Sequence, residues 1–81
     1  MQWLHTKRSR RDYQGAPPEV QRAFDKQIRL LAQNLRHPSL HAKKYDEGAN
    51  VWQARVTRDW RFYFTVDAAT YTILAIVRHP K

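Results

Sequence analysis

The stretch VWQARVTRDWRFYFTV, residues 51–66, decides the fold because apolar and polar residues alternate along it. Alternation with a period of two is typical of a strand that buries one face. The residues expected on the buried face are Trp52, Ala54, Val56, Trp60, Phe62, Phe64 and Val66. Those expected on the opposite face are Gln53, Arg55, Thr57, Arg61, Tyr63 and Thr65. A short connection near Arg58 and Asp59 suits a hairpin, so the stretch predicts two antiparallel strands, over residues 51–56 and 60–66.

A third strand and a long helix are predicted on either side of this hairpin. Residues 71–77, YTILAIV, are apolar on both faces, as expected of an interior strand, and the connection at residues 67–70 suits a second hairpin. Residues 16–38 predict a helix that begins with Pro17 and Pro18 and ends at His37 and Pro38. Its apolar positions recur at spacings of three and four and form one stripe: Val20, Phe24, Ile28, Leu31 and Leu35.

The first part of the chain predicts a strand and a short helix. Residues 2–6, QWLHT, place Trp3 and His5 on one face and Leu4 on the other. Ser9 and Asp12 have the spacing of a weak capping box, so residues 9–13 predict a short helix. Residues 39–50, SLHAKKYDEGAN, predict a loop. Together these elements predict one α+β domain over residues 1–81, in the order βααβββ. Its antiparallel sheet is expected to carry two helices on one face and to leave the other face open.

The composition limits the classes of function. Fifteen Lys and Arg residues stand against 7 Asp and Glu, which gives a net charge of +8 and favours RNA, DNA or an acidic protein as partner. The absence of cysteine excludes disulfides and thiolate metal sites and fits a reducing compartment. We expect a cytoplasmic protein without membrane attachment, because no apolar stretch approaches a membrane span and the N-terminus has no apolar signal core.

The open face of the predicted sheet collects the chemically active residues. Arg55, Arg61 and Tyr63 lie on it together with Gln53, and no carboxylate is among these strand-face residues. Further candidates lie at its borders: Lys43 and Lys44 in the loop before the sheet, Arg58 at the turn, and Arg78, His79 and Lys81 after the last strand. The remaining histidines at positions 5, 37 and 41 look incidental. Pro38 separates His37 from His41, so no metal site is expected.

These residue types suit metal-independent cleavage of RNA. A base takes the proton of a 2′-hydroxyl, which attacks the adjacent phosphorus, while cations stabilise the phosphoryl oxygens and an acid protonates the leaving 5′-oxygen. We assign the acid–base role to His79 and phosphate binding to Arg55 and Arg61. Contact with RNA is assigned to Lys43, Lys44, Arg58, Tyr63, Arg78 and Lys81. Solvated surface residues and a histidine near a chain end are common, and that alternative stays open for each of them.

Three stretches carry a resemblance to a known family. They are PPEVQRAFDKQIRLLAQNLRHPSLHAKKY, VWQARVTRDWRFYFTV and TILAIVRHPK, in that order. Their order and spacing over nearly the whole chain resemble the RelE/ParE superfamily, the toxins of bacterial type II toxin–antitoxin systems. The resemblance implies a compact toxin, without a cofactor, that a cognate antitoxin protein neutralises.

The resemblance also implies residue roles and leaves the activity open. Members similar to RelE cleave mRNA on the ribosome, whereas members similar to ParE poison DNA gyrase and lack the catalytic residues. Arg61 matches the family's phosphate-stabilising arginine, Arg55 matches a lysine or arginine of the preceding strand, and His79 lies near the catalytic position after the last strand. Gln53 stands where the RNA-cleaving members often have another cation. The expectation is therefore an mRNA endonuclease, with a gyrase inhibitor, or a degenerate relative that only binds an antitoxin, as the alternatives.

Overall fold

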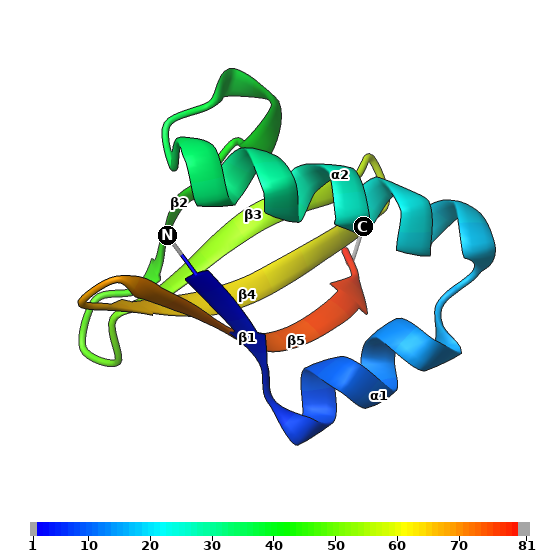
Figure 1. Ribbon diagram of the computed structural model, residues 1–81, viewed down its shortest axis with the longest axis horizontal. Helices are drawn as coiled ribbons and strands as arrows, with labels where there is room; N and C mark the ends of the chain where they lie inside the picture. Colours follow the sequence, from blue (N-terminus) through cyan, green and yellow to red (C-terminus); the bar gives the residue numbers. More distant parts are fainter. Residues whose placement is uncertain (1, 80–81) are drawn as a thin grey trace.

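A computed structural model describes residues 2–79 as a mixed sheet with two helices (Figure 1). The chain begins with strand β1 (Gln2–His5) and the helices α1 (Lys7–Gly15) and α2 (Pro18–Gln33). A 3₁₀ turn, η1 (Pro38–Leu40), leads into strands β2 (Lys43–Asp46), β3 (Val51–Thr57), β4 (Trp60–Asp67) and β5 (Thr70–Arg78). The α+β class is confirmed, as are the three strands expected over residues 51–77. Lys81 was expected to contact RNA and lies outside the described residues.

The strands lie side by side in the order β1-β5-β4-β3-β2. The prediction of a wholly antiparallel sheet was wrong, because β1 pairs with β5 in parallel, with Gln2 opposite Thr70 and His5 opposite Ile73. The other three pairings are antiparallel. The β4–β5 hairpin leaves one edge of β5 without a partner, and the first strand fills part of that edge. This pairing joins distant segments, so it leaves no trace in the local periodicity of either strand.

The core lies between α2 and one face of the sheet. α2 crosses the sheet and packs on β3, whereas α1 lies along β5 (Figure 1). Four of the predicted stripe residues are buried on α2: Val20, Phe24, Ile28 and Leu31. They meet the buried side chains of the sheet, which include Ala54, Val56, Phe62, Phe64 and Ile76. The Phe24 and Phe62 rings touch edge to face at 5.3 Å between centroids, so the predicted apolar faces of helix and hairpin pack together.

Both helices differ from their predicted limits for local reasons. α1 begins at Lys7, because Thr6 and Ser9 form the capping box that was expected to begin at Ser9. α2 ends at Gln33, before the predicted end at His37 and Pro38, because Asn34 is extended. The Asn34 side-chain oxygen accepts a hydrogen bond from the Arg36 N–H at 3.0 Å, so it competes with the helix for that backbone.

Within residues 2–79, no helix combines the length and the apolar character needed to cross a membrane.

The predicted loop of residues 39–50 contains an edge strand. β2 pairs antiparallel with β3, so that Lys43 lies opposite Gln53 and Lys44 opposite Trp52. All four residues of β2 are exposed, so no apolar alternation announces the strand. Its backbone pairing therefore positions the basic residues that follow η1. α1 protects the opposite edge of the sheet. There the Asp12 Oδ2 atom accepts a hydrogen bond from the Ile76 N–H of β5 at 3.0 Å, beyond the end of β1.

Candidate functional site

The strand register brings the predicted polar residues together on the open face. Arg55 on β3 lies opposite Arg61 on β4, and Gln53 lies opposite Tyr63. Arg61 in turn lies opposite Val77 on β5. Because alternate residues of a strand share a face, His79 is in phase with Val77 and with the arginines. The sequence alone does not determine on which face of the sheet His79 lies, and this register places it on the open face.

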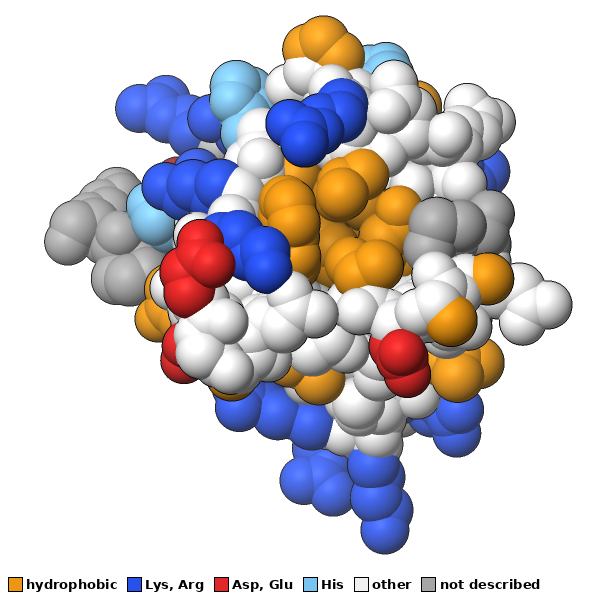
Figure 2. Space-filling view, turned by 90° about the vertical axis from the view of Figure 1, so that its left-hand side faces the viewer, with side chains coloured by type: hydrophobic (Ala, Val, Ile, Leu, Met, Phe, Trp, Pro, Cys, Tyr) orange, Lys and Arg blue, Asp and Glu red, His pale blue; other side chains and the backbone are white. Residues whose placement is uncertain are grey.

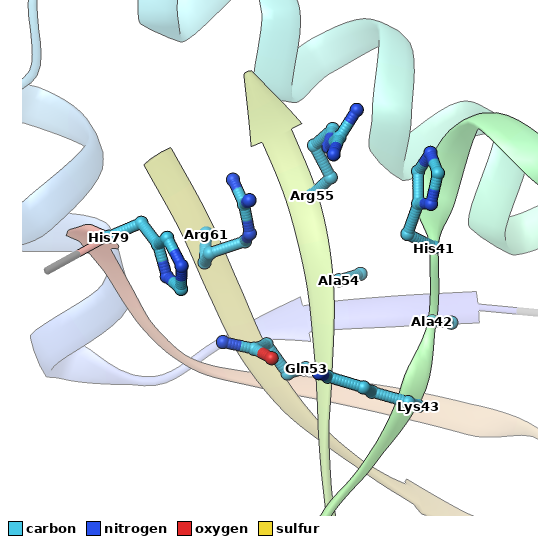
Figure 3. Close-up of a pocket in the computed structure, with 8 residues that line it drawn as sticks. All are labelled: His41, Ala42, Lys43, Gln53, Ala54, Arg55, Arg61 and His79. Atoms are coloured by element: carbon cyan, nitrogen blue, oxygen red, sulfur yellow. The ribbon is translucent and has the colours of Figure 1, made fainter. Parts of the chain in front are cut away.

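A cavity of about 400 Å³ lies at this end of the open face (Figure 3). Its lining includes three cations, two imidazoles and an amide: Lys43, Arg55, Arg61, His41, His79 and Gln53. Two small residues, Ala42 and Ala54, also line it, and no carboxylate side chain is among its lining residues within residues 2–79. Figure 3 shows Arg61 and Arg55 between the two imidazoles, with Gln53 and Lys43 along the adjacent side. This collection of charge suits a polyanionic ligand.

Arg61 is held in place by the turn between β3 and β4. Its Nη1 donates to the carbonyl oxygens of Thr57 at 2.6 Å, Trp60 at 2.9 Å and Arg58 at 3.1 Å. Burial lowers the pKa of Arg61, and the nearby charge of Arg55 lowers it further. The nearby charge of Asp59 partly offsets this lowering. The side chain is therefore fixed in position, and no carboxylate is among the described residues that line the cavity with it.

Arg55 has an incompletely satisfied guanidinium. Its Nε is buried, and this atom has no hydrogen-bond partner among the described residues. Its backbone carbonyl accepts from the buried Gln27 side chain at 2.9 Å, next to the β-bulge that follows Arg55. A buried donor without a partner costs free energy, so this guanidinium lowers the stability of the fold.

His79 is anchored by its backbone. Its N–H donates to the carbonyl oxygen of Asp59 at 2.7 Å, which ties the residue after β5 to the β3–β4 turn. The side chain is exposed and lines the cavity beside Arg61 (Figure 3). His79 is therefore not a frayed residue at the end of the strand. Its side chain is free to meet a ligand while its backbone is held.

His41 also lines the cavity, although its sequence position looked incidental. It follows η1 with a left-handed backbone, at φ 47°, and its N–H donates to the Pro38 carbonyl oxygen. Histidine tolerates this conformation better than most residues. Lys43 also lines the cavity, and Tyr45, two residues on, lies beside Tyr63 on the same face. β2 begins only at Lys43, so no strand alternation in the sequence identifies His41 as a cavity residue.

An aromatic pair extends the open face away from the cavity. The Tyr45 and Tyr63 rings lie 4.8 Å apart between centroids, and Tyr45 is 63% exposed. The Tyr63 hydroxyl accepts a hydrogen bond from Gln53 Nε2 at 3.1 Å. Gln53 is 7% exposed, so it links the aromatic pair to the cavity rather than standing free on the surface.

Three of the residues expected to bind RNA lie elsewhere. Lys44 Nζ lies 5.3 Å from the centroid of the Trp52 ring and bonds to the Asn50 side chain, so it belongs to the opposite face from Lys43. Arg78 lies opposite Trp60, a residue that packs against the core, and it is also turned from the cavity side. Arg58 is exposed at the turn, and only its carbonyl contacts Arg61. The expectation that these cations gather on one face with the arginines is wrong for Lys44 and Arg78.

The described residues contain no cluster of three or more His, Asp or Glu side chains that could hold a metal ion. His37 and His41 both border a second cavity of about 150 Å³, together with Arg36, Leu35 and Trp52. The His37 ring nitrogen accepts the Ser39 N–H at 3.2 Å, which caps η1. The two histidines therefore differ in their surroundings: His37 caps η1, whereas His41 also lines the larger cavity beside the arginines.

Comparisons with known proteins identify structures that share this architecture. No protein-family model and no curated protein matches the sequence. Among solved structures, a YoeB/ParE toxin from Agrobacterium tumefaciens is similar at 17% identity and a TM-score of 0.82, covering 99% of this chain and 100% of that one. The RelBE2 toxin–antitoxin complex from Mycobacterium tuberculosis contains a chain that is 22% identical at a TM-score of 0.78, with 96% of both chains covered.

A third structure shows the same similarity. The YoeB–YefM toxin–antitoxin complex from Staphylococcus aureus, described as heterotetrameric, contains a chain that is 15% identical, with a TM-score of 0.78 and coverage of 99% of this chain and 98% of that one. Identities this low speak for the architecture rather than for shared chemistry. The fold implied by the resemblance in the sequence is confirmed: the chain folds as the YoeB, ParE and RelE toxins do.

Proposed function

We propose that the protein is the toxin of a toxin–antitoxin system and cleaves mRNA on the ribosome without a metal ion. The observation that carries the proposal is the cavity in which Lys43, Arg55 and Arg61 meet two imidazoles, with no carboxylate among the described lining residues. Carboxylates would repel a phosphate, whereas guanidinium groups bind it through paired donors. The fold shared with toxins of known structure supports the toxin part of the proposal.

In this proposal the phosphate to be cleaved lies between the two arginines. The guanidinium groups of Arg55 and Arg61 stabilise the charge that develops on the phosphoryl oxygens. His79 takes part in proton transfer, because an imidazole titrates near neutral pH. Tyr45 and Tyr63 offer exposed ring surface on which an adjacent base stacks. Lys43 contacts the neighbouring phosphate, whereas Lys44 points toward Trp52.

The test is to map transcript ends in cells after the protein is induced. The wild type is expected to produce new 5′ ends within translated mRNAs, and the His79→Ala, Arg55→Ala double variant is expected to produce none. Lys43→Ala and Lys44→Ala form a matched pair, since they are neighbours on opposite faces of β2. We expect Lys43→Ala to reduce cleavage and Lys44→Ala to leave it unchanged. Absence of cleavage by the folded wild type would contradict the proposal.

A protein antitoxin is the second part of the proposal. Figure 2 shows a patch of hydrophobic side chains that is bordered on one side by Lys and Arg side chains, with few acidic side chains in view. Leu35 and Trp52 line the second cavity beside Arg36, so apolar surface and positive charge occur together there as well. An amphipathic acidic segment fits such a surface. We expect the product of an adjacent gene to co-purify with the protein and to suppress its toxicity.

One observation favours a different toxin activity. The Arg61 Nη1 atom donates to three backbone carbonyls, as is typical of an arginine with a structural role. If the open face only binds, inhibition of DNA gyrase is the alternative function. Loss of supercoiling activity and a DNA-damage response on induction, without new mRNA ends, would identify it. Normal growth on induction would instead identify a relative that only binds its antitoxin.

A further inference from the structure

We propose that His41 is a second catalytic residue and that cleavage uses the two imidazoles His41 and His79 as its acid–base pair. This inference rests on the proposed mRNA cleavage and names the groups that move its protons. Both imidazoles line the same cavity, although their positions in the chain are 41 and 79. The chain reaches the cavity at His41 through η1 and at His79 through the end of β5.

The other lining residues leave the proton transfers to these two side chains. The cleavage needs one group that accepts a proton and one that donates a proton. Lysine and arginine side chains are protonated near neutral pH, glutamine and alanine do not titrate, and none of the lining residues that the structure describes carries a carboxylate side chain. Among the described lining residues, the imidazoles are therefore the side chains whose class changes protonation near neutrality. A single imidazole cannot both accept and donate a proton within the same step, so the step needs both imidazoles.

The arrangement of the cavity suits this division. Arg61 and Arg55 lie between the two imidazoles, so a phosphate held by the arginines has one imidazole toward each side (Figure 3). An in-line displacement requires this relation, because the entering and leaving oxygens lie on opposite sides of the phosphorus. The charged groups that face the pair come from three strands: Lys43 on β2, Arg55 on β3 and Arg61 on β4. On its other side His41 borders Arg36 and His37.

The step balances without an oxidant, a reductant or a metal. The neutral imidazole accepts the proton of the 2′-hydroxyl, whose oxygen forms a bond to phosphorus. The bond from phosphorus to the 5′-oxygen breaks, and this oxygen takes the proton of the imidazolium. The products are a 2′,3′-cyclic phosphate end and a 5′-hydroxyl end. After the step the first imidazole is protonated and the second is neutral. Proton transfer to and from water then restores the starting state of both.

Single-turnover cleavage of a synthetic mRNA on ribosomes, followed across neutral pH, tests the pair. The wild type is expected to show a bell-shaped rate profile. His41→Asn and His79→Asn are each expected to slow cleavage by about 10²- to 10⁴-fold and to remove one limb, a different limb in each variant. Asparagine tolerates the left-handed backbone at position 41, so His41→Asn keeps the local conformation. His37→Asn is the control, because it replaces a histidine that caps η1 and retains an acceptor.

An mRNA with sulfur in place of the leaving 5′-oxygen separates the two roles. A thiolate leaves without protonation, so this substrate is expected to restore the rate of the variant that lacks the acid and not of the variant that lacks the base. His41→Gly supplies a second test, since glycine fits the left-handed backbone and leaves space for free imidazole, which is expected to recover activity. A role of His41 in folding alone would produce neither effect.

Three outcomes would overturn the proposal and are distinguishable. If the wild type cleaves and His41→Asn keeps its rate and both limbs, His41 is not catalytic and the proposed function stands. The same holds if the His41 and His79 variants lose the same limb. If the wild type does not cleave at all, the proposed function fails first, and this inference fails with it.

Discussion

The two faces of the sheet differ in the interactions that their side chains make. On the face beneath α2, Phe62 and Phe64 are fully buried against Phe24 and other apolar side chains. On the open face, Arg55 and Arg61 lie opposite each other, and Arg55 Nε is buried without a partner among the described residues. One face holds the chain together by removing apolar area from water. The other keeps like charges close together, and we interpret that arrangement as preparation for an anionic ligand.

The largest expected effect is on the covered face. Phe62→Ala removes a ring that is buried between Phe24 and Phe64, so it should lower the free energy of unfolding by about 3–5 kcal/mol. Urea denaturation followed by circular dichroism measures this loss. Tyr63→Ala is the matched control, since the neighbouring side chain on the open face is only half-buried. Equal losses for the two variants would show that the faces do not differ as described.

The next effect concerns the polar link beneath β3. Gln27 Nε2 donates to the carbonyl oxygens of Arg55 at 2.9 Å and Ser39 at 3.1 Å, and Gln27 is 4% exposed. Gln27→Leu removes both of these hydrogen bonds from a buried site and should cost about 1–3 kcal/mol of stability. The same denaturation experiment measures it, with the exposed Gln33→Leu on α2 as control. A neutral Gln27→Leu would mean that water or a shift of β3 satisfies both carbonyls.

A smaller effect of opposite sign is expected on the open face. Arg55→Leu removes one of two adjacent like charges and a donor without a partner, so it should raise the free energy of unfolding by about 0.5–1 kcal/mol. At the same time it should abolish the proposed cleavage. Arg58→Leu, at the exposed turn, should change stability by less than about 0.5 kcal/mol. Destabilisation by Arg55→Leu would indicate a structural role for this guanidinium.

The smallest expected effect is a pH dependence on the covered side. Burial lowers the pKa of His5, and Arg10 lowers it further against the opposing effect of Asp25. The unfolded chain then binds a proton more readily than the folded one, so stability is lost as pH falls below the ordinary value of 6.5. The wild type should therefore lose more stability between neutral and mildly acidic pH than His5→Gln. Equal pH dependences of the two proteins would contradict this assignment.

The sequence predicts the covered face well and the open face only in part. Trp52, Phe62 and Phe64 alternate with polar residues, and Val20, Phe24 and Ile28 follow a helical period, so local pattern identifies their common side. Arg55, Arg61 and His79 were expected near one another, and the register brings them to one cavity. Their proximity depends on strand pairing, which follows from the two short hairpins.

The remainder depends on features that carry no periodicity. β2 is exposed throughout, and its pairing alone sends Lys43 to the cavity and Lys44 to Trp52. His41 reaches the cavity because η1 ends in a left-handed residue, a conformation that the sequence does not announce at a histidine. The parallel partner of β1 lies at the far end of the chain. Each of these features requires knowledge of contacts between segments that are distant in sequence.

The parallel pairing of β1 with β5 has a consequence for the order of folding. Thr6 Oγ1 donates to the Leu74 carbonyl oxygen across 68 residues of chain, and the intervening hairpins close over much shorter loops. Contacts between distant segments form late, because the loop entropy must be overcome before they add stability. During synthesis the first strand therefore waits for the last one to leave the ribosome. We expect the nascent chain to lack a complete sheet, and with it the arrangement of His79 beside Arg61, until translation of β5 is finished.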